Sequence, residues 1–458
     1  MPRAQIVGLG RSGVAAARLL QQAGWHVELS DRNDTATLQT LAQSLRTAGI
    51  MVKLGYSLVL SPGCEPDAII VSPGVPWDLP VLVAARDRGI DTLGEMELAW
   101  RHLQTVPWVA ITGTNGKTTT TALTAAMFQA AGLQAPACGN IGYAACELAI
   151  QQHPPQPPVY DWIVAEISSY QIESSRELAP QIGIWTTFSP DHLQRHYTLE
   201  NYQAIKASLL QRSRQQIFNG DDPHLRQAGC ATWPDAYWTS VQGRENLLVP
   251  PERGVYIEAG QIVAFGEAIA PVASLRMLGV HNQQNLLLAV GAARLAGIDA
   301  EAIARAIAAF PGVPHRLELV AVEQGIEFVN DSKATNYDAA QVGLAAVPPG
   351  AILIAGGEAK AGDDRQWLAT IRQRAAAVML IGAAAPTFAQ ALDRAGYSDW
   401  EILETLDEAV PRSLTRAHEL GAKTVLFSPA CASFDQYQSF EQRGEHFRRL
   451  CRQLASDG

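Results

Sequence analysis

The chain has 458 residues, and at ~150 residues per domain this length predicts about three domains. Hydrophobic residues make up 47% and charged residues 17% of the sequence, which supplies several ordinary cores and excludes a disordered or fibrous chain. The 35 basic and 45 acidic residues give a net charge of −10, which excludes a general nucleic-acid binder or anionic-membrane binder, because both need a basic face.

The cysteines and the apolar runs indicate the cellular compartment of the protein. Six cysteines are scattered without a Cys-x-x-Cys pair, which argues against a disulfide framework or a zinc site. A strand-like run begins at Ala4 and leaves no room for a signal sequence, and apolar stretches such as 375–385 are far shorter than the roughly 20 residues of a membrane helix. We therefore expect a cytoplasmic protein without a membrane span, acting as a monomer.

Short apolar runs alternate with Ala/Leu-rich amphipathic segments, the pattern typical of βα units and parallel sheets. The expected strands are 4–7, 27–30, 68–71, 108–112, 162–167, 182–187, 216–219, 326–330, 351–355, 378–381 and 424–428, with a hairpin near 254–263. Pro-containing stretches at 104–107 and 311–314 separate three such series. We predict an α/β fold of three domains, at residues 1–104, 105–312 and 313–458.

A glycine-rich turn follows the first expected strand. Gly8, Gly10 and Gly13 precede a helix, and Asp31 follows the next strand. This arrangement matches the dinucleotide fingerprint, in which glycines let the backbone approach a diphosphate at a helix N-terminus. It predicts a nucleotide diphosphate, although a turn that needs glycine only for packing remains the alternative.

A second phosphate-binding loop follows strand 108–112. Gly113-Thr114-Asn115-Gly116-Lys117-Thr118 joins that strand to a helix ending near Gly132. In such loops the backbone amides surround phosphates, the lysine reaches the terminal ones, and the threonine hydroxyl joins the Mg²⁺ shell. The full P-loop pattern would have a further glycine at Ile111. Two such loops in separate series predict two phosphorylated ligands.

Polar side chains follow several other strands, where ligands of open α/β sheets bind. Glu166 and His192 carry oxygen and nitrogen donors suited to a divalent cation, although each alone also suits a capping or packing role. Lys206, on an expected helix at 199–210, has the composition of a solvated helix lysine. Asn282 and Asn285 share a helix face and could hold a nucleotide or simply cap the helix.

The third series has three strands that end in dense polar sets. These sets are Asn330-Asp331-Ser332-Lys333-Ala334-Thr335-Asn336, Gly356-Gly357-Glu358-Ala359-Lys360 and Ser428-Pro429-Ala430-Cys431-Ala432-Ser433-Phe434-Asp435-Gln436. Three strands ending this way in one domain favour a ligand site over capping. We interpret Cys431 as a small packed residue, not a nucleophile.

These motifs together resemble the ATP-dependent Mur ligase family. The resemblance rests on 113–118, Glu166 with Ser168-Ser169, Asp191-His192, His281-Asn282-x-x-Asn285 and His315-Arg316. The N-terminal glycine motif, the sets at 330–336 and 428–436, and Phe440-Glu441-Gln442-Arg443-Gly444 are similar to its D-glutamate-adding members. The resemblance spans nearly the whole chain.

The resemblance implies a fold and an activity. The fold is a Rossmann-like N-terminal domain, a P-loop ATPase-like central domain and a Rossmann-like C-terminal domain. The activity is ATP-dependent ligation of D-glutamate to UDP-N-acetylmuramoyl-L-alanine through an acyl phosphate, a step of peptidoglycan precursor synthesis that serves cell-wall formation, cell shape and division. ATP and two Mg²⁺ ions would take part.

The resemblance also assigns roles to residues. Lys117, Glu166, His192 and Lys206 would be catalytic. The sugar nucleotide would contact Arg11, Ser12, Asp31, Gly74, Asn140, Ser168 and His192. ATP would contact Gly113, Thr114, Asn115, Gly116, Lys117, Thr118, Asn282, Arg316 and Asp331. Metal ions would bind Thr118, Glu166, His192 and a carbamylated Lys206, and D-glutamate would bind Thr335, Lys360, Ser433 and Phe440.

Three other activities compete with this interpretation. A sister Mur ligase or a folylpolyglutamate-synthase-like ligase would share the ATP loop but differ at Lys360, Ser433 and Phe440. A nicotinamide oxidoreductase would explain the first glycine motif but not the Gly-Lys-Thr loop. A P-loop switch or motor would hydrolyse nucleotide without forming a bond.

Overall fold

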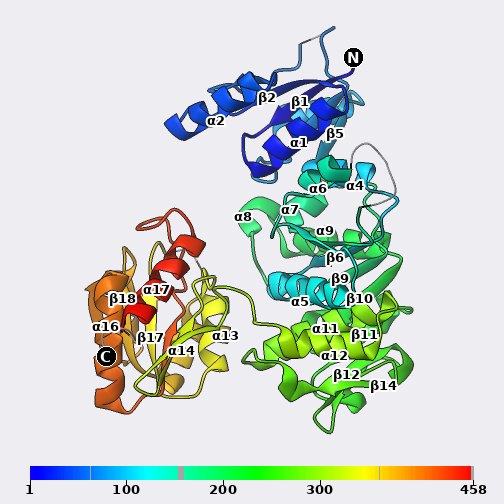
Figure 1. Cartoon of the computed structure of the whole chain (residues 1–458). Coiled ribbons are helices and arrows are strands. Elements are labelled where there is room, and N and C mark those ends of the chain that lie inside the picture. The colour runs from blue at the N-terminus through cyan, green and yellow to red at the C-terminus, as the bar shows by residue number, and fades with distance from the viewer. Residues whose placement is uncertain (62, 153–158, 360–361, 455–458) are drawn as a thin grey trace. The chain divides into compact units, whose positions relative to one another are not determined.

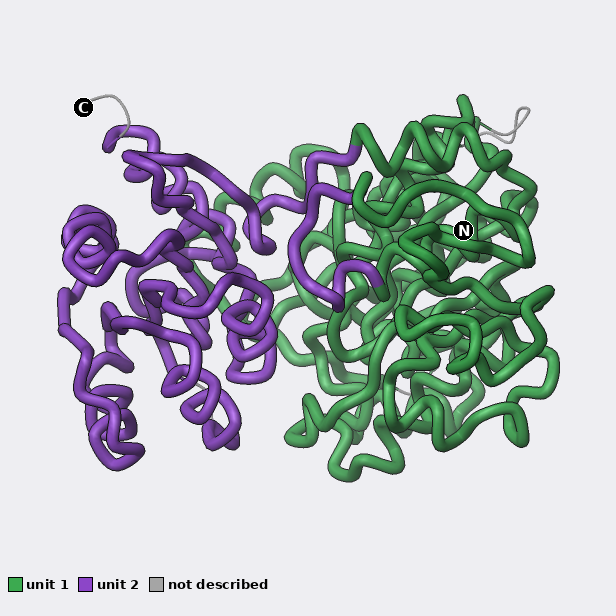
Figure 2. Tube along the Cα trace, turned by 90° about the horizontal axis from the view of Figure 1, so that it is seen from below, with its two compact units in different colours: residues 1–274, 284–309 green, residues 275–283, 310–458 purple. Residues whose placement is uncertain are grey.

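The computed structural model describes residues 1–61, 63–152, 159–359 and 362–454, and it confirms the α/β fold class (Figure 1). The strands form three sheets of five, nine and six members. The chain divides into two compact units, one of Met1–Ser274 with Gln284–Ala309 and one of Leu275–Gln283 with Phe310–Gly458 (Figure 2). The domain bounds at residues 104 and 312 stay a prediction.

The first sheet has the parallel order β3-β2-β1-β4-β5, which is the Rossmann order 3-2-1-4-5-6 without its sixth strand. Alternate residues of β4 pack on opposite faces, Ala68 and Ile70 in the main core and Ile69 and Val71 against Leu82 of α3. Helices therefore cover both faces, as a parallel sheet requires. The elements are β1 (Arg3–Val7), α1 (Arg11–Gln22), β2 (His26–Ser30), α2 (Ala36–Thr47), β3 (Met51–Lys53), β4 (Ala68–Val71), α3 (Pro80–Asp87), β5 (Asp91–Gly94) and α4 (Glu95–His102).

The second sheet has the order β14-β13-β12-β11-β10-β9-β6-β8-β7. Strands β12, β13 and β14 form an antiparallel meander at one edge of this sheet. The expected hairpin is present, with its turn at Gly260. The elements are β6 (Trp108–Thr112), α5 (Lys117–Ala130), β7 (Ala137–Gly139), α6 (Ala145–Gln152), β8 (Ile163–Glu166), α7 (Ser169–Glu173), β9 (Ile182–Trp185), α8 (Leu193–His196), α9 (Leu199–Arg212), β10 (Gln215–Asn219), α10 (Pro223–Thr232), β11 (Tyr237–Ser240), β12 (Gly254–Glu258), β13 (Gln261–Ala264), β14 (Glu267–Pro271), α11 (Val280–Leu295) and α12 (Ala300–Ala309). Three short 3₁₀ turns, η1 (Arg244–Asn246), η2 (Pro251–Arg253) and η3 (Val272–Ser274), flank the meander.

The third sheet has the order β15-β16-β20-β17-β18-β19, and only β15 pairs antiparallel. Its faces again divide by alternation, since Leu353 and Ile354 of β17 belong to different core clusters. The elements are β15 (Glu318–Glu323), β16 (Ile326–Asn330), α13 (Tyr337–Ala346), β17 (Ala351–Gly356), α14 (Arg365–Arg374), β18 (Ala375–Ile381), α15 (Ala385–Arg394), β19 (Trp400–Glu404), α16 (Leu406–Leu420), β20 (Thr424–Phe427) and α17 (Phe440–Leu454).

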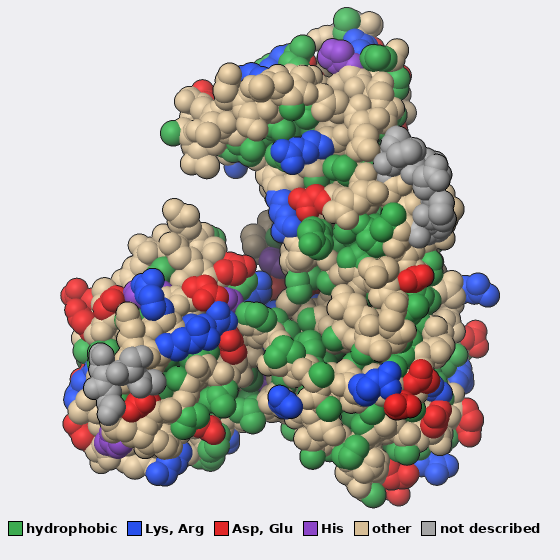
Figure 3. Space-filling model, viewed as in Figure 1, with side chains coloured by type: hydrophobic (Ala, Val, Ile, Leu, Met, Phe, Trp, Pro, Cys, Tyr) green, Lys and Arg blue, Asp and Glu red, His purple; other side chains and the backbone are tan. Residues whose placement is uncertain are grey.

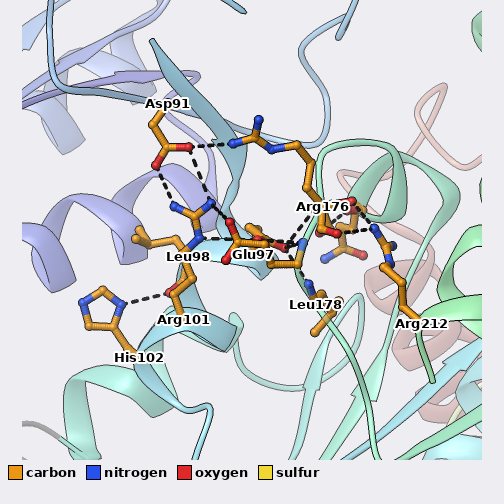
Figure 4. A network of polar contacts seen from close by, with 11 residues as sticks. Asp91, Glu97, Leu98, Arg101, His102, Arg176, Leu178 and Arg212 are labelled. Atoms are coloured by element: carbon orange, nitrogen blue, oxygen red, sulfur yellow. Dashed lines mark hydrogen bonds and ion pairs between the residues drawn. The ribbon is translucent and has the colours of Figure 1, made fainter. Parts of the chain in front are cut away.

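Helix α4 joins the first two sheets into one unit. The Glu97 carboxylate is fully buried and accepts backbone N–H groups of Arg176, Glu177 and Leu178 at 3.0–3.1 Å (Figure 4). Arg101, one turn along α4, contacts Glu97 and pairs with Asp91 at 2.6 Å (Figure 4). A single apolar core also runs from the first sheet into the second. The segment after α7 is thereby fixed to the first sheet.

The surface and the helix lengths agree with the composition. On the face drawn in Figure 3, acidic and basic side chains are interspersed. Among the described residues, no helix has the length and apolarity that crossing a bilayer requires.

Candidate functional site

In the first two sheets a glycine loop leaves the sheet at a topological switch point, where adjacent strands lead away in opposite directions and ligands bind. In the first sheet this strand is β1, which lies between β2 and β4, and in the second it is β6, between β9 and β8. In the third sheet the polar strand ends belong to the neighbouring strands β16, β20 and β17. The two glycine loops leave β1 and β6, so the sequence motifs coincide with these points.

The loop after β6 needs glycine at two positions. Gly113 has φ +151°, and a Cβ there would lie 1.9 Å from the Thr186 hydroxyl. Gly116 has φ +84°, and its Cβ would lie 2.4 Å from the Asn285 side-chain oxygen. Thr114 donates its backbone N–H to the carbonyl of Thr187 at 2.9 Å. Strand-end residues of β9 thus hold the loop open as a backbone cradle.

Two lysines converge on one carbonyl oxygen in this loop. The Nζ atoms of Lys117 and Lys206 each donate to the Gly113 carbonyl at 2.9 Å, and Lys117 also donates to Thr114 O at 2.8 Å. Lys206 is 1% exposed. Its burial, together with the nearby Lys117 charge, moves the pKa of its amine well below the usual value. The composition-based expectation of a solvated Lys206 is therefore wrong.

The sequence did contain a signal for this burial. The buried residues of α9 are Tyr202, Lys206, Leu209 and Leu210, which follow the i, i+4, i+7, i+8 spacing of an apolar stripe. A lysine in a core-facing position of a helix is unusual, and the Tyr202 ring lies 4.7 Å from its Nζ. The helical register, not the residue type, identifies Lys206.

Glu166 ends β8 next to the loop. Its side chain is 1% exposed, and Oε1 accepts a hydrogen bond from the Asn140 amide at 2.8 Å. Among the described residues Oε2 is buried without a hydrogen-bond partner. A buried carboxylate oxygen without a partner costs free energy unless a cation binds it or a water molecule donates a hydrogen bond to it. Glu166 therefore fits a divalent cation.

His192 is the N-cap residue just before α8 and is held from both sides. Its backbone has φ +55°, and its ring Nδ1 lies 3.1 Å from the Tyr170 hydroxyl. Its Nε2 lies 3.4 Å from the Asp191 carboxylate. Within the described part of the chain no three His, Cys, Asp or Glu side chains gather as a ready-made metal cage. Such a site suits Mg²⁺ shared with phosphates, because Mg²⁺ usually takes one or two carboxylates plus phosphate oxygens.

A cavity of about 780 Å³ opens at the switch point of the first sheet. Arg11, Ser12, Asp31 and Gly74, four of the residues assigned to the sugar nucleotide, line it together. The Asp31 carboxylate accepts the backbone N–H groups of Leu9 and Asn33, each at 2.8 Å, so it also braces the glycine loop.

The glycine loop at this cavity is packed too closely for side chains. A Cβ on Gly13 would lie 2.0 Å from the Gly8 carbonyl oxygen, and the Ser72 hydroxyl donates to that oxygen at 2.9 Å. Sequence reasoning missed Arg32, Asn33, Tyr56, Ser57 and Leu58, which also line the cavity. They follow β2 and β3 without a recognisable motif.

The other residues assigned to the sugar nucleotide belong to the second sheet. Asn140 contacts Glu166 as described, and His192 immediately precedes α8. Ser168 forms a capping box with Gln171 at the start of α7, so its side chain has a structural role. Neither Asn140, Ser168 nor His192 lines the cavity of the first sheet.

The third sheet brings its own strand ends together. The Asp331 carboxylate accepts from the Ser428 hydroxyl at 2.8 Å, and burial raises its pKa to about 7. Ser433 is buried, and Phe440 begins α17 beside Lys333, whose Nζ lies 3.8 Å from its ring centre. Thr335 lies in the loop between Asp331 and α13. Lys360 lies outside the described residues.

Arg443 is a buried residue of this region to which the sequence analysis gave no role. Its buried guanidinium donates to the backbone carbonyls of Ser332, Cys431 and Ala432 at 2.8–3.0 Å. It thereby joins the loops that follow β16 and β20. Cys431 is fully buried, as expected for a packed residue.

The remaining residues assigned to ATP lie on α11 and before β15. Asn282 is buried and donates to the Leu278 carbonyl at 2.7 Å. Arg316 lies near His281, and burial together with that charge lowers the pKa of His281 to about 4. Asn282, Arg316 and Asp331 belong to the second compact unit, as does His281. The loop at 113–118 belongs to the first unit.

Comparison with known proteins covers the whole chain. Residues 2–94 match the family model "Mur ligase MurD-like, N-terminal domain", residues 111–293 match "Mur ligase middle domain", and residues 315–431 match "Mur ligase, glutamate ligase domain". Proteins named UDP-N-acetylmuramoylalanine–D-glutamate ligase are similar throughout. The one from Microcystis aeruginosa is 64% identical over 99% of this chain and all of its own length. The one from Synechocystis is 60% identical over 98% of this chain and 99% of its own.

Solved structures show the same fold at low identity. UDP-N-acetylmuramate–alanine ligase from Thermotoga maritima has a TM-score of 0.59 at 18% identity and covers all of both chains. A pseudomurein peptide ligase type C from Methanothermus fervidus has a TM-score of 0.61 at 19% identity, over 99% of this chain and all of its own.

Proposed function

The chain belongs to the Mur ligase family, and on that premise we propose that it joins D-glutamate to the carboxylate of UDP-N-acetylmuramoyl-L-alanine at the expense of ATP. The observation that carries this proposal is the 60–64% identity, over essentially the full length, to proteins whose printed name states that reaction. The product would be a precursor of peptidoglycan, made in the cytoplasm by a monomer.

The chemistry explains why two phosphate-binding loops are needed. A carboxylate and an amine do not condense in water, so a carboxylate oxygen of the sugar nucleotide first attacks the γ-phosphorus of ATP, and ADP leaves. The amine of D-glutamate then attacks the carbonyl carbon of this acyl phosphate, loses a proton and releases inorganic phosphate. The enzyme has to hold the reacting groups together and keep water away from the intermediate.

Lys117 would neutralise charge on the transferring phosphoryl group. Its ammonium donates to the Gly113 and Thr114 carbonyls, and a terminal phosphate would replace these weaker neutral acceptors. Mg²⁺, when bound, supplies Lewis-acid stabilisation of the phosphates. Thr118, the free oxygen of Glu166 and His192 would hold it.

Lys206 would be carbamylated and hold a second Mg²⁺. Burial lowers the pKa of its amine and so favours the neutral form, which is the form that adds to carbon dioxide, forming an N–C bond and losing one proton. The product would be an anionic oxygen beside the P-loop. Mass spectrometry of the intact protein and assays in bicarbonate-free buffer test this role, and an unmodified lysine with an undiminished rate would contradict it.

The cavity of the first sheet and the strand ends of the third sheet would bind the two substrates between which the amide bond forms. The cavity of the first sheet has the size of a small-molecule site and would hold the uridine diphosphate sugar. Ser433, Thr335, Phe440 and Lys360 would surround D-glutamate, with Arg443 positioning the two loops around it.

The direct test is phosphate release from ATP with UDP-N-acetylmuramoyl-L-alanine and one of D-glutamate, L-glutamate, L-lysine or no amino acid. Release with D-glutamate alone supports the proposal. Release with another amino acid would favour a sister ligase, and release without any would favour a P-loop switch. A change of NADH fluorescence on adding the protein would revive the oxidoreductase.

A further inference from the structure

The segment 192–197, which carries His192, is strained at both ends. His192 has φ +55° and Tyr197 has φ +67° with ψ −46°, and neither is glycine. Non-glycine residues keep such conformations only where surrounding contacts hold them, and these residues gather at functional sites. The contacts that hold this segment therefore bear on the placement of His192.

One of these contacts comes from the first sheet's own loops. The Tyr197 hydroxyl donates to Oδ2 of Asp78, and Arg195 pairs with Oδ1 of the same carboxylate at 3.9 Å. Asp78 lies between Pro76 and Leu79, which both line the 780 Å³ cavity. Asp78, which does not itself line the cavity but is flanked by residues that do, thus holds the far end of the segment that starts with His192.

Further contacts link Arg195 to the imidazole ring of His192. The Arg195 guanidinium pairs with Glu173 at 2.7 Å and lies 5.4 Å from the centre of the Tyr170 ring. The Tyr170 hydroxyl in turn lies 3.1 Å from Nδ1 of His192. A hydrogen-bond partner on one ring nitrogen fixes the orientation of a metal-binding histidine, so this contact bears on how the His192 ring is placed.

We propose that Asp78 is a positioning residue, which couples occupation of the sugar-nucleotide cavity to the placement of His192. A ligand against Pro76 and Leu79 restricts the loop that carries Asp78, and the contacts with Tyr197 and Arg195 pass this restriction to the strained segment. A segment that is already ordered binds its second ligand with a smaller entropy cost, so the two ligands favour each other. This inference rests on the proposed function.

The coupling can be measured without turnover. Calorimetry gives the affinity for UDP-N-acetylmuramoyl-L-alanine with and without Mg²⁺ and a non-hydrolysable ATP analogue. We expect the analogue to tighten this affinity in the unaltered protein. Asp78→Ala and Tyr197→Phe should each reduce that tightening by about three- to tenfold, the range of one exposed charge-assisted contact, and leave the affinity without analogue unchanged. The Asp78→Asn variant keeps an acceptor oxygen and should recover part of the coupling.

Controls separate this role from a structural one. Asp87→Ala, which removes an exposed carboxylate at the end of α3, should leave the coupling unchanged. The double variant Asp78→Ala/Tyr197→Phe should be no worse than Asp78→Ala alone, because both remove one contact. Equal coupling in all variants, or none in the unaltered protein, would overturn the inference. Failure of the unaltered protein to bind the sugar nucleotide would instead overturn the proposed function.

Discussion

Lys117 and Lys206 lie in the same site but differ in their burial. Both donate to the Gly113 carbonyl, yet Lys117 is half-buried at the mouth of the loop and Lys206 is enclosed. The Gly-Lys-Thr motif identifies the first from sequence. The second needs the register of α9 and the burial of its neighbours, which only the folded chain provides.

Replacing Lys117 tests the phosphoryl-transfer role. We expect Lys117→Ala to reduce D-glutamate-dependent phosphate release by about 10³-fold, because one preorganised cation at the developing charge is removed. Circular dichroism should show an unchanged fold, since the Lys117 ammonium donates to the carbonyls of Gly113 and Thr114 in its own loop. A loss smaller than tenfold would contradict the role.

Glu95 gives a prediction for pH dependence. Burial raises the pKa of its carboxyl to about 7, whereas the unfolded chain releases this proton near 4.5. Between these values the folded state binds more protons, so the free energy of unfolding falls as pH rises, by up to about 1.4 kcal/mol per pH unit. Glu95→Gln carries no such proton. Urea denaturation from pH 5 to 7 should show a shallower decline for this variant, and parallel curves would contradict the prediction.

At the scale of elements, many strands with apolar runs were predictable, whereas edge strands such as β3, β7 and β19 and the junctions between sheets were not. Expected strands at 68–71, 108–112 and 326–330 match β4, β6 and β16 residue for residue, because each is a short apolar run followed by a polar turn. The role of α4 was not predictable. Glu97 binds backbone groups about 80 residues later in the chain, and no local pattern identifies such a partner.

The junction made by α4 can be tested by stability. Glu97→Ala leaves three backbone N–H groups without their acceptor, that of Leu178 being buried, and we expect the free energy of unfolding to fall by roughly 3 kcal/mol. Glu177→Ala is the matched control, because this exposed carboxylate also pairs with Arg101 but should change stability by less than about 1 kcal/mol. Equal effects of the two substitutions in urea denaturation would contradict the role of Glu97.

At the scale of the whole molecule, the sequence predicts three series of βα units, and three sheets are present. How the sheets group was not predictable. The first two share one core through α1, α4 and α6, and residues Leu275–Gln283 belong to the second compact unit although they precede most of α11 in the chain. Such grouping depends on contacts between distant segments, which composition and turn residues do not encode.

In the proposed reaction ATP activates the carboxylate of the sugar nucleotide before the amine attacks. The most direct measurement uses UDP-N-acetylmuramoyl-L-alanine with both carboxylate oxygens replaced by ¹⁸O, and follows the inorganic phosphate by mass spectrometry. Transfer through an acyl phosphate predicts that each phosphate released with D-glutamate carries one ¹⁸O atom, while the new amide keeps the other. Phosphate without ¹⁸O would show that ATP is hydrolysed by water and would contradict the account.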